Sequence, residues 1–530
     1  MKSFDVVVQT QAGKVGGSKT DGVSVFKGVP YGAPTGGANR FKAPKPRAPW
    51  ADIFDATEFG PTAPQRSHAE MGSSEPDDEE GKQRKAAFGQ FLHGLAGDEP
   101  AQSEDCLRLN IWTGGLDTTK SRAVMVWLHG GAFESGSGSW PMYEGTPLAA
   151  RDDVVVVTVN HRLGVLGFLY LDQVAGDEYA GSGNAGMLDI VQALEWIRDN
   201  ISQFGGDPSK VMVFGSSGGA SKTSTLLAMP AAQGLFHRGA LMSGPLLRVR
   251  SAEHAAAVTQ QLLARLGLSA NNIGKLHDYP YQTLLTEAAH LALPIDAGLA
   301  AAANPEDFMP MQPVVDGGAI PLQPMDPVAS PYGVNVQMIV GSTRDDMKMM
   351  MLSMPWFGTL DEAGLEQFFA ATYAELAGPM LAEYRRLYPA ATPTDIACQS
   401  VTDRVMWDGG VQWAERKSAD TAPVYIYRFD FVTPIMGGIL GATHGGDIPF
   451  AMNNYSYTPM AGDRPENALM GAVMSEAFVQ FAHTGNPNHD NLPVWQPYSP
   501  AHRNTLVFDT ESWAQCDPQS ALRELYATMR

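Results

Sequence analysis

Apolar runs recur along the chain and predict the strands of a central sheet. They occupy residues 6–8, 23–26, 123–128, 154–159, 211–214, 336–340, 424–429 and 506–508. The runs at 123–128 and 154–159 have no polar alternation, which is typical of parallel strands buried on both faces. Residues 189–204 instead carry apolar side chains at helical spacing. Strands and helices alternate without a linker or repeat, so we expect residues 1–530 to form a single α/β domain.

Three stretches depart from this alternation. Residues 66–102 are polar and carry an acidic run at 75–80, and we expect a surface insertion of a loop and a short helix. This insertion is either a solvated loop or a flap near a pocket mouth. Residues 250–330 and 355–420 are rich in Ala and Leu, and we expect mainly helical subdomains that form the walls of a pocket.

Composition and charge exclude several classes of partner. The chain has 57 acidic and 37 basic residues, a formal net charge of −20, which argues against nucleic acid or an anionic membrane as the main partner. We see no secretory signal and no apolar stretch of about 18 residues, so we expect no stable membrane insertion. The cysteines Cys106, Cys398 and Cys516 are few and widely spaced, which fits buried thiols in the cytoplasm. Composition leaves the oligomeric state open.

The segment 204–219, FGGDPSKVMVFGSSGG, carries the first candidate chemistry. It ends in a Gly-x-Ser-x-Gly pentapeptide centred on Ser217. The apolar run at 211–214 predicts a strand before this serine, and residues 220–229 predict a helix after it. A serine on such a strand-to-helix turn is the nucleophile elbow of α/β-hydrolases, where the outer glycines prevent a collision of strand and helix. The pentapeptide alone also occurs in ordinary Gly/Ser-rich loops, so its context carries the prediction.

Several blocks together resemble type-B carboxylesterases, the family of cholinesterases and p-nitrobenzyl esterases. Residues 204–219 resemble the family's serine signature, and residues 104–110 resemble its second signature, with Arg108 where an aromatic residue or Thr is usual. Further similar blocks occupy residues 26–31, 159–164 and 184–189. The resemblance implies an α/β-hydrolase fold with a large, mostly parallel sheet, flanking helices and helical insertions around the pocket. It also implies a carboxylic ester hydrolase with a small-molecule ester substrate, no cofactor and no metal.

A serine nucleophile needs a base and an acid, in the chain order Ser, acid, His. His444 lies in a glycine-flanked loop, residues 441–450, that resembles the family's histidine block. Asp346 stands where the resemblance places the acid, with an aspartate in place of the usual glutamate. Asp345 beside it stays open as the alternative. The predicted catalytic residues are therefore Ser217, Asp346 and His444.

Residues 129–133, His-Gly-Gly-Ala-Phe, follow the strand predicted at 123–128. They match the loop that supplies backbone donors to the oxyanion in α/β-hydrolases. The resemblance implies that Gly131 and Ala132 donate together with Gly218, the residue after the nucleophile. The alternative is an ordinary glycine turn after a strand.

Two departures from the family pattern change the expected properties. Ser216 stands where the family usually has Glu, which lowers the negative charge beside the nucleophile and makes a preference for cationic substrates less expected. Ala63 stands where the partner of Cys106 would be, so we expect Cys106 to be a free, buried thiol.

Other conspicuous residues have two interpretations. We expect Asp189, Asp447, His161 and His237 to be structural. The methionines from Met347 to Met354 either line an apolar pocket or pack in the core. For the whole chain, the alternatives to an esterase are a non-catalytic binding or adhesion protein of the same fold, or a hydrolase of amides, carbamates or thioesters.

Overall fold

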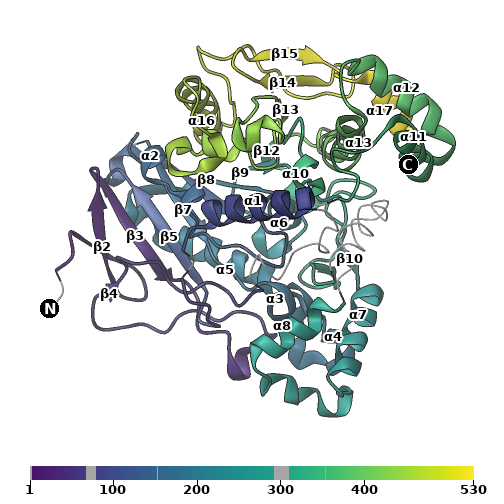
Figure 1. The fold of residues 1–530 in the computed structure, drawn as a ribbon. Coiled ribbons are helices and arrows are strands. Elements are labelled where there is room, and N and C mark those ends of the chain that lie inside the picture. Colours follow the sequence, from purple (N-terminus) through teal and green to yellow (C-terminus); the bar gives the residue numbers. More distant parts are fainter. Residues whose placement is uncertain are drawn as a thin grey trace.

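A 13-stranded sheet runs through the molecule in the order β1-β2-β3-β5-β7-β6-β8-β9-β12-β13-β14-β15, with β4 paired to β2 (Figure 1). The computed structural model describes residues 3–66, 79–98, 100–151, 153–291, 310–352 and 354–529. The strands of this sheet are β1 Val6–Gln9, β2 Lys14–Thr20, β3 Val23–Pro30, β4 Phe54–Asp55, β5 Arg108–Thr113, β6 Arg122–Leu128, β7 Val154–Val159, β8 Gly206–Ser216, β9 Arg238–Met242, β12 Gln337–Thr343, β13 Val424–Phe429, β14 Asn504–Phe508 and β15 Trp513–Cys516. The predicted apolar runs are confirmed as strands, and the run at 211–214 is the end of the longer β8.

The centre of the sheet is parallel and its two ends are antiparallel. Every pair from β7 through β6, β8, β9, β12 and β13 to β14 is parallel. The pairs β1–β2, β2–β3, β3–β5, β5–β7 and β14–β15 are antiparallel, while the short β4 pairs with β2 in parallel. Carboxyl ends of parallel strands meet at one edge of a sheet. The loops that follow β6, β8, β12 and β13 therefore gather at the same edge.

Side chains of the central strands alternate between two buried layers. In β6, Val124 and Val126 pack in the same core as α5 (Ala185–Asn200), while Met125 and Trp127 pack in the core that holds α16 (Asn467–Thr484). Helices thus cover both faces of the sheet, as Figure 1 shows. This explains why the strand at 123–128 is apolar throughout. The predicted helix at 189–204 is α5 followed by a 3₁₀ turn, Ile201–Phe204.

The other helices lie in the connections between strands and after the last strand, and α6 and α14 also pack against central strands. They are α1 Glu79–Ala96, α2 Thr146–Ala149, α3 Gly164–Phe168, α4 Asp172–Ala175, α6 Gly218–Leu226, α7 Ala252–Arg265, α8 Tyr281–Ala289, α10 Lys348–Met351, α11 Glu362–Tyr373, α12 Ala377–Leu387, α13 Pro393–Thr402, α14 Asp408–Lys417, α15 Ile448–Ala451 and α17 Ser520–Ala527. A π-helical turn, Asp403–Trp407, joins α13 to α14. A small parallel pair, β10 (Arg250–Ser251) and β11 (Val314–Val315), lies beside α7.

The described residues place helices in all three stretches singled out in the sequence. Within 66–102 there is α1, and residues 67–78 and 99 lie outside the described residues. Within 250–330 there are α7 and α8, and residues 292–309 lie outside the described residues. Residues 355–420 contain α11 to α14. Their roles as a flap and as pocket walls stay predictions.

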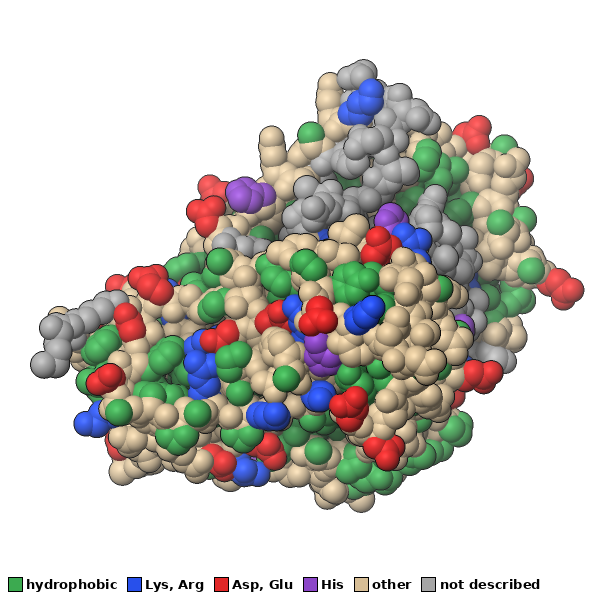
Figure 2. Space-filling model, turned by 90° about the horizontal axis from the view of Figure 1, so that it is seen from below, with side chains coloured by type: hydrophobic (Ala, Val, Ile, Leu, Met, Phe, Trp, Pro, Cys, Tyr) green, Lys and Arg blue, Asp and Glu red, His purple; other side chains and the backbone are tan. Residues whose placement is uncertain are grey.

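Charged side chains are dispersed over one face of the molecule. On the face that Figure 2 shows, acidic and basic side chains are interspersed, and neither forms a continuous patch. None of the helices in the described ranges has the length and apolarity that crossing a bilayer requires.

Candidate active site

Ser217 stands at the turn between β8 and α6. β8 ends at Ser216 and α6 begins at Gly218. Ser217 has a φ of +58° and a ψ of −124°, a conformation that residues with a Cβ rarely adopt. Its N–H donates to the carbonyl of Met242, the last residue of β9, at 2.8 Å. The neighbouring strand thus holds a strained turn, which leaves Ser217 half-buried between buried neighbours.

Glycines let this turn pack directly against the end of β6. A Cβ at Gly215 or Gly219 would collide with the carbonyl of Leu128, and a Cβ at Gly218 would collide with the backbone of Ala132. Main-chain obstacles cannot rotate away as a side chain can. The glycines therefore set how closely the elbow approaches the loop after β6.

That loop presents unpaired backbone donors beside the serine. Gly131 and Ala132 have φ values of +82° and +56°, and the N–H of Ser135 donates back to the Gly131 carbonyl at 3.0 Å. Within the described part of the chain, the N–H groups of Gly131, Ala132 and Gly218 have no hydrogen-bond acceptor. Three free donors from two touching segments form an arrangement that can hold a negatively charged oxygen.

His444 and Asp346 meet from two different loops. Asp346 follows β12, and His444 lies between β13 and α15. Nδ1 of His444 lies 2.5 Å from Oδ1 of Asp346. Oδ2 of Asp346 accepts from Ser243 Oγ at 2.5 Å and from both the N–H and the hydroxyl of Thr343 at 3.0 Å. The carboxylate is fully buried, and hydrogen bonds satisfy both of its oxygens.

The protonation states of this pair are coupled. Burial opposes ionisation of Asp346, but the His444 charge and the hydrogen bonds from His444, Ser243 and Thr343 outweigh it and hold the pKa of Asp346 below its usual range. Burial would lower the pKa of His444, but Asp346 raises it above 6.5. An ionised Asp346 orients the Nδ1–H of His444 and leaves Nε2 free to accept a proton.

Ser217 and His444 share no hydrogen bond among the residues described. Nucleophile–base contacts of this kind are often long before substrate binds and tighten in the complex. The structure thus brings Asp346 and His444 into contact, and it brings Ser217 against the loop of Gly131 and Ala132.

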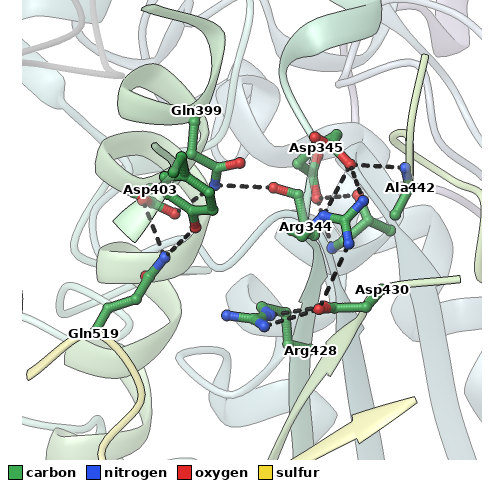
Figure 3. A network of polar contacts seen from close by, with 11 residues as sticks. Arg344, Asp345, Gln399, Asp403, Arg428, Asp430, Ala442 and Gln519 are labelled. Atoms are coloured by element: carbon green, nitrogen blue, oxygen red, sulfur yellow. Dashed lines mark hydrogen bonds and ion pairs between the residues drawn. The ribbon is translucent and has the colours of Figure 1, made fainter. Parts of the chain in front are cut away.

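Asp345 fastens the histidine loop and does not contact the imidazole. Its N–H donates to the Ala442 carbonyl at 2.9 Å, and its carboxylate accepts from the Ala442 N–H at 2.8 Å. The same carboxylate pairs with Arg344 at 3.1 Å, as Figure 3 shows. Of the two adjacent acids, Asp346 is the one that reaches His444.

α13 and the π-helical turn lie next to the segment that carries Asp346 and hold its backbone (Figure 3). Nε2 of Gln399 donates to the Arg344 carbonyl at 3.0 Å and to Oδ1 of Asp403 at 2.9 Å. Oγ1 of Thr402 accepts from the Met347 N–H at 2.9 Å. π-Helical turns often occur near functional sites. Here α13 supports the backbone on both sides of Asp346 through Gln399 and Thr402, and Asp403 of the π-helical turn holds the Gln399 amide.

Sequence reasoning missed Ser243. It follows β9 directly, and its hydroxyl reaches Asp346 across the sheet edge. The available signal was its place: a Ser-Gly pair directly after a buried strand, at the edge where the candidate loops meet.

The residues expected to be structural have partners inside the fold. These contacts are an ion pair, two side-chain hydrogen bonds and a ring stack: Asp189 with Arg162 at 2.6 Å, Asp447 with the Tyr427 hydroxyl at 2.6 Å, His237 with the Val211 N–H at 3.3 Å, and His161 with His129 at 5.0 Å between ring centroids.

The methionines at 347, 349, 351 and 354 are buried in the core that holds α16, so of their two interpretations the structure supports packing.

All three cysteines are free thiols. Cys106 and Cys398 are buried, and burial raises the pKa of each to about 12. The prediction of a free Cys106 is confirmed. The expectation that the thiols are buried is wrong for Cys516, which is exposed because it lies at the end of the edge strand β15.

In the described residues, no three His, Cys, Asp or Glu side chains are grouped to hold a metal.

The sheet, the elbow on its central strand and the acid–histidine pair at the same edge define an α/β-hydrolase. The sequence profile of the carboxylesterase family matches residues 5–523. The chain belongs to this carboxylesterase family, and it is a carboxylic ester hydrolase that acts on small-molecule esters.

Relatives and solved structures cover nearly the whole chain. The para-nitrobenzyl esterase of Bacillus subtilis is 35% identical, with 98% of each chain covered. The phenmedipham hydrolase of Pseudarthrobacter oxydans is 32% identical, with 95% of each covered. The crystal structure of a Geobacillus stearothermophilus carboxylesterase aligns with a TM-score of 0.81 and 34% identity over 98% of this chain and 99% of that one.

Proposed function

We propose that this carboxylesterase cleaves small to medium esters, uncharged or moderately apolar, with Ser217 as nucleophile, His444 as base and Asp346 as acid. The observation that carries this proposal is the contact of Asp346 with His444 at the sheet edge where the strained turn exposes Ser217. The reaction proceeds through an acyl-enzyme intermediate.

In the first half-reaction, Nε2 of His444 takes the proton of Ser217 as Oγ attacks the ester carbonyl. The tetrahedral intermediate collapses, and the proton passes from His444 to the departing alcohol oxygen. In the second half-reaction, water gives a proton to His444 and attacks the acyl-enzyme. The acid is then released, and Ser217 regains its proton. Asp346 stays ionised and stabilises the imidazolium at each step.

The developing oxyanion would accept hydrogen bonds from Gly131, Ala132 and Gly218. Their N–H groups are unpaired among the described residues, so they need no rearrangement to bind the negative oxygen. Loss of one such donor typically lowers turnover by about 100- to 1,000-fold.

Electrostatics beside the nucleophile support an uncharged substrate. Ser216 is buried on β8, and a hydroxyl replaces the carboxylate expected from the family resemblance. The loop after β6 that contains Gly131 and Ala132 is called the donor loop, and Glu134 follows it directly. Burial raises the pKa of Glu134 to about 7, so this side chain carries only partial negative charge at neutral pH. Neither Ser216 nor Glu134 therefore supplies a full negative charge that would attract a cationic substrate.

A p-nitrobenzyl ester, suggested by the name of the Bacillus subtilis relative, is a direct probe. We expect wild-type enzyme to release p-nitrobenzyl alcohol and Ser217→Ala to lose at least about 10⁴-fold in turnover. Retention of wild-type turnover by folded Ser217→Ala would remove Ser217 from the mechanism. No turnover of any ester by wild-type enzyme would favour a non-catalytic binding protein.

The same triad chemistry can cleave amides, carbamates and thioesters. A panel that holds the acyl group constant and changes the leaving group among these classes would rank them by kcat/KM. We expect the oxygen ester to rank first.

A further inference from the structure

Lys222 is a fully buried lysine behind the nucleophile elbow. It lies on α6, the helix that begins at Gly218, and its side chain is 0% exposed. Nζ donates to the carbonyl of His129 at 2.9 Å. It forms no ion pair with a carboxylate among the described residues, and burial lowers its pKa to about 7.

Burial of an amine without a counter-ion is unfavourable, whereas a hydrocarbon side chain would fill the same space at no such cost. The one polar contact that Lys222 makes in the described residues is therefore informative. Its acceptor, the His129 carbonyl, lies between the end of β6 and the glycines of the donor loop.

His129 is restrained on several sides. Its carbonyl lies 3.1 Å from the position that a Cβ on Gly219 would take, so the backbone is pressed against the first turn of α6. Its ring Nδ1 donates to the Gly130 carbonyl at 2.8 Å, and the ring stacks on His161 with planes 10° apart. Burial first, and then the charge of Lys222, lower the pKa of His129 and keep the imidazole neutral.

The proposed oxyanion donors come from two separate segments. Gly218 belongs to the start of α6, while Gly131 and Ala132 belong to the loop after β6. Lys222 projects from α6 and donates to the carbonyl of His129, which directly precedes the donor loop. It therefore links the two segments. A misplacement of about 1 Å at such a site can cost roughly 100-fold in rate.

We propose that Lys222 is a positioning residue that sets the distance between the two groups of oxyanion donors through its hydrogen bond to His129. This inference rests on the proposed function, because it assumes that Gly131, Ala132 and Gly218 bind the oxyanion. It assigns Lys222 no contact with substrate.

Lys222→Met tests the proposal, since methionine is similar in length and removes the donor. We expect kcat to fall by about 10- to 100-fold while KM changes by less than about threefold. A trifluoromethyl ketone, which adds to the serine and forms an oxyanion, should bind more weakly by a similar factor. The matching secondary alcohol, which forms no oxyanion, should bind as it does to wild-type enzyme.

Lys417→Met is the matched control. Lys417 is also a buried lysine that donates to a carbonyl, that of Gly333 at 2.8 Å, but it lies on α14 and has Asp420 as a partner. We expect this variant to lower thermal stability and leave kcat and the ketone-to-alcohol affinity ratio unchanged. A purely structural Lys222 would behave in the same way, and that result would overturn the proposal.

Lys222→Gln carries the test if the methionine variant does not fold. Its amide keeps an N–H donor on a shorter side chain, so we expect a loss of about tenfold in ketone affinity with the alcohol unaffected. Wild-type ketone affinity in folded Lys222→Gln would overturn the proposal. If wild-type enzyme itself fails to bind the ketone, the oxyanion assignment fails first, and the positioning role falls with it.

Discussion

The two sides of the site are held by different kinds of contact. On the elbow side, Ser217 and its donors are placed by main chain pressed against main chain, with Gly218 and Gly219 at the points of contact. On the acid–histidine side, Asp346 and His444 are placed by a network of side-chain hydrogen bonds that involves several other loops and helices. The packed main chain at the elbow has almost no room for an added atom. The network around Asp346 and His444 can lose one hydrogen bond while the backbone keeps its conformation.

This difference predicts different responses to mutation. Elbow substitutions should act through sterics and affect folding and turnover together. On the acid–histidine side, substitution of the carboxylate that contacts His444 should lower turnover strongly. Substitution of the groups that hold this carboxylate should lower turnover only weakly.

Asp346→Asn should have the largest effect. The amide cannot stabilise the imidazolium, and it favours the wrong tautomer of His444, so we expect kcat to fall by about 10⁴-fold with little change in KM. Steady-state kinetics on a p-nitrobenzyl ester would measure this.

Asp345→Asn is the internal control for that result. The amide introduced there would keep an oxygen to accept the Ala442 N–H, which lies 2.8 Å from the present carboxylate. We expect turnover to stay within about tenfold of wild type, because the histidine loop keeps most of its support. The reverse order of the two variants would reassign the acid.

Gly219→Ala should have the next largest effect and should act differently. The new Cβ would meet the Leu128 carbonyl, so α6 or the donor loop must shift. We expect a loss of about 100-fold or more in kcat together with a lower free energy of unfolding, by about 1–3 kcal/mol. Gly378→Ala on α12 is the control, because apart from its chain neighbours and the backbone of its own helix no described atom lies within 4 Å of its Cβ position. This variant should leave kcat unchanged.

The same contrast explains what could be predicted from the sequence. The elbow is a local motif, because its geometry requires glycines at fixed offsets from Ser217, and its strand and helix were predictable from the flanking pattern. For the acid, the family resemblance favoured Asp346 and left Asp345 as the alternative. The residues alone could not decide between them, because the choice depends on which carboxylate faces a residue 98 positions away. The sequence carried a positional signal for Ser243, which directly follows a buried strand, but it did not identify Asp346 as its partner, and it carried no signal for Lys222. Both residues acquire their roles only through contacts between distant segments.

The pH dependence tests the coupling of the acid and the histidine. Asp346 raises the pKa of His444 above 6.5, and in the proposed mechanism only neutral His444 can accept the Ser217 proton. The value of kcat/KM should therefore fall as pH decreases through the raised His444 pKa, about tenfold per unit below it, and should be half-maximal above pH 6.5. In Asp346→Asn the residual activity should show this limb at lower pH, since the raising charge is gone. An unmoved limb would mean that another group controls it.

Ser243→Ala should have a smaller effect than Asp346→Asn or Gly219→Ala, and it separates a supporting hydrogen bond from the proposed catalytic contact. Asp346 would lose the donor at 2.5 Å but keep both donors of Thr343, so its carboxylate stays ionised and in place. A hydrogen bond to a charged group contributes about 1.5–3 kcal/mol, which corresponds to about 13- to 160-fold. Because the two Thr343 donors remain, we expect kcat to fall only by about tenfold, the lower end of that range. Ser342→Ala is the matched control, since the buried Ser342 hydroxyl has no partner among the described residues, and kcat should not change. Equal effects of the two variants would show that the acid side responds to packing alone, and the contrast between the two sides of the site would then be lost.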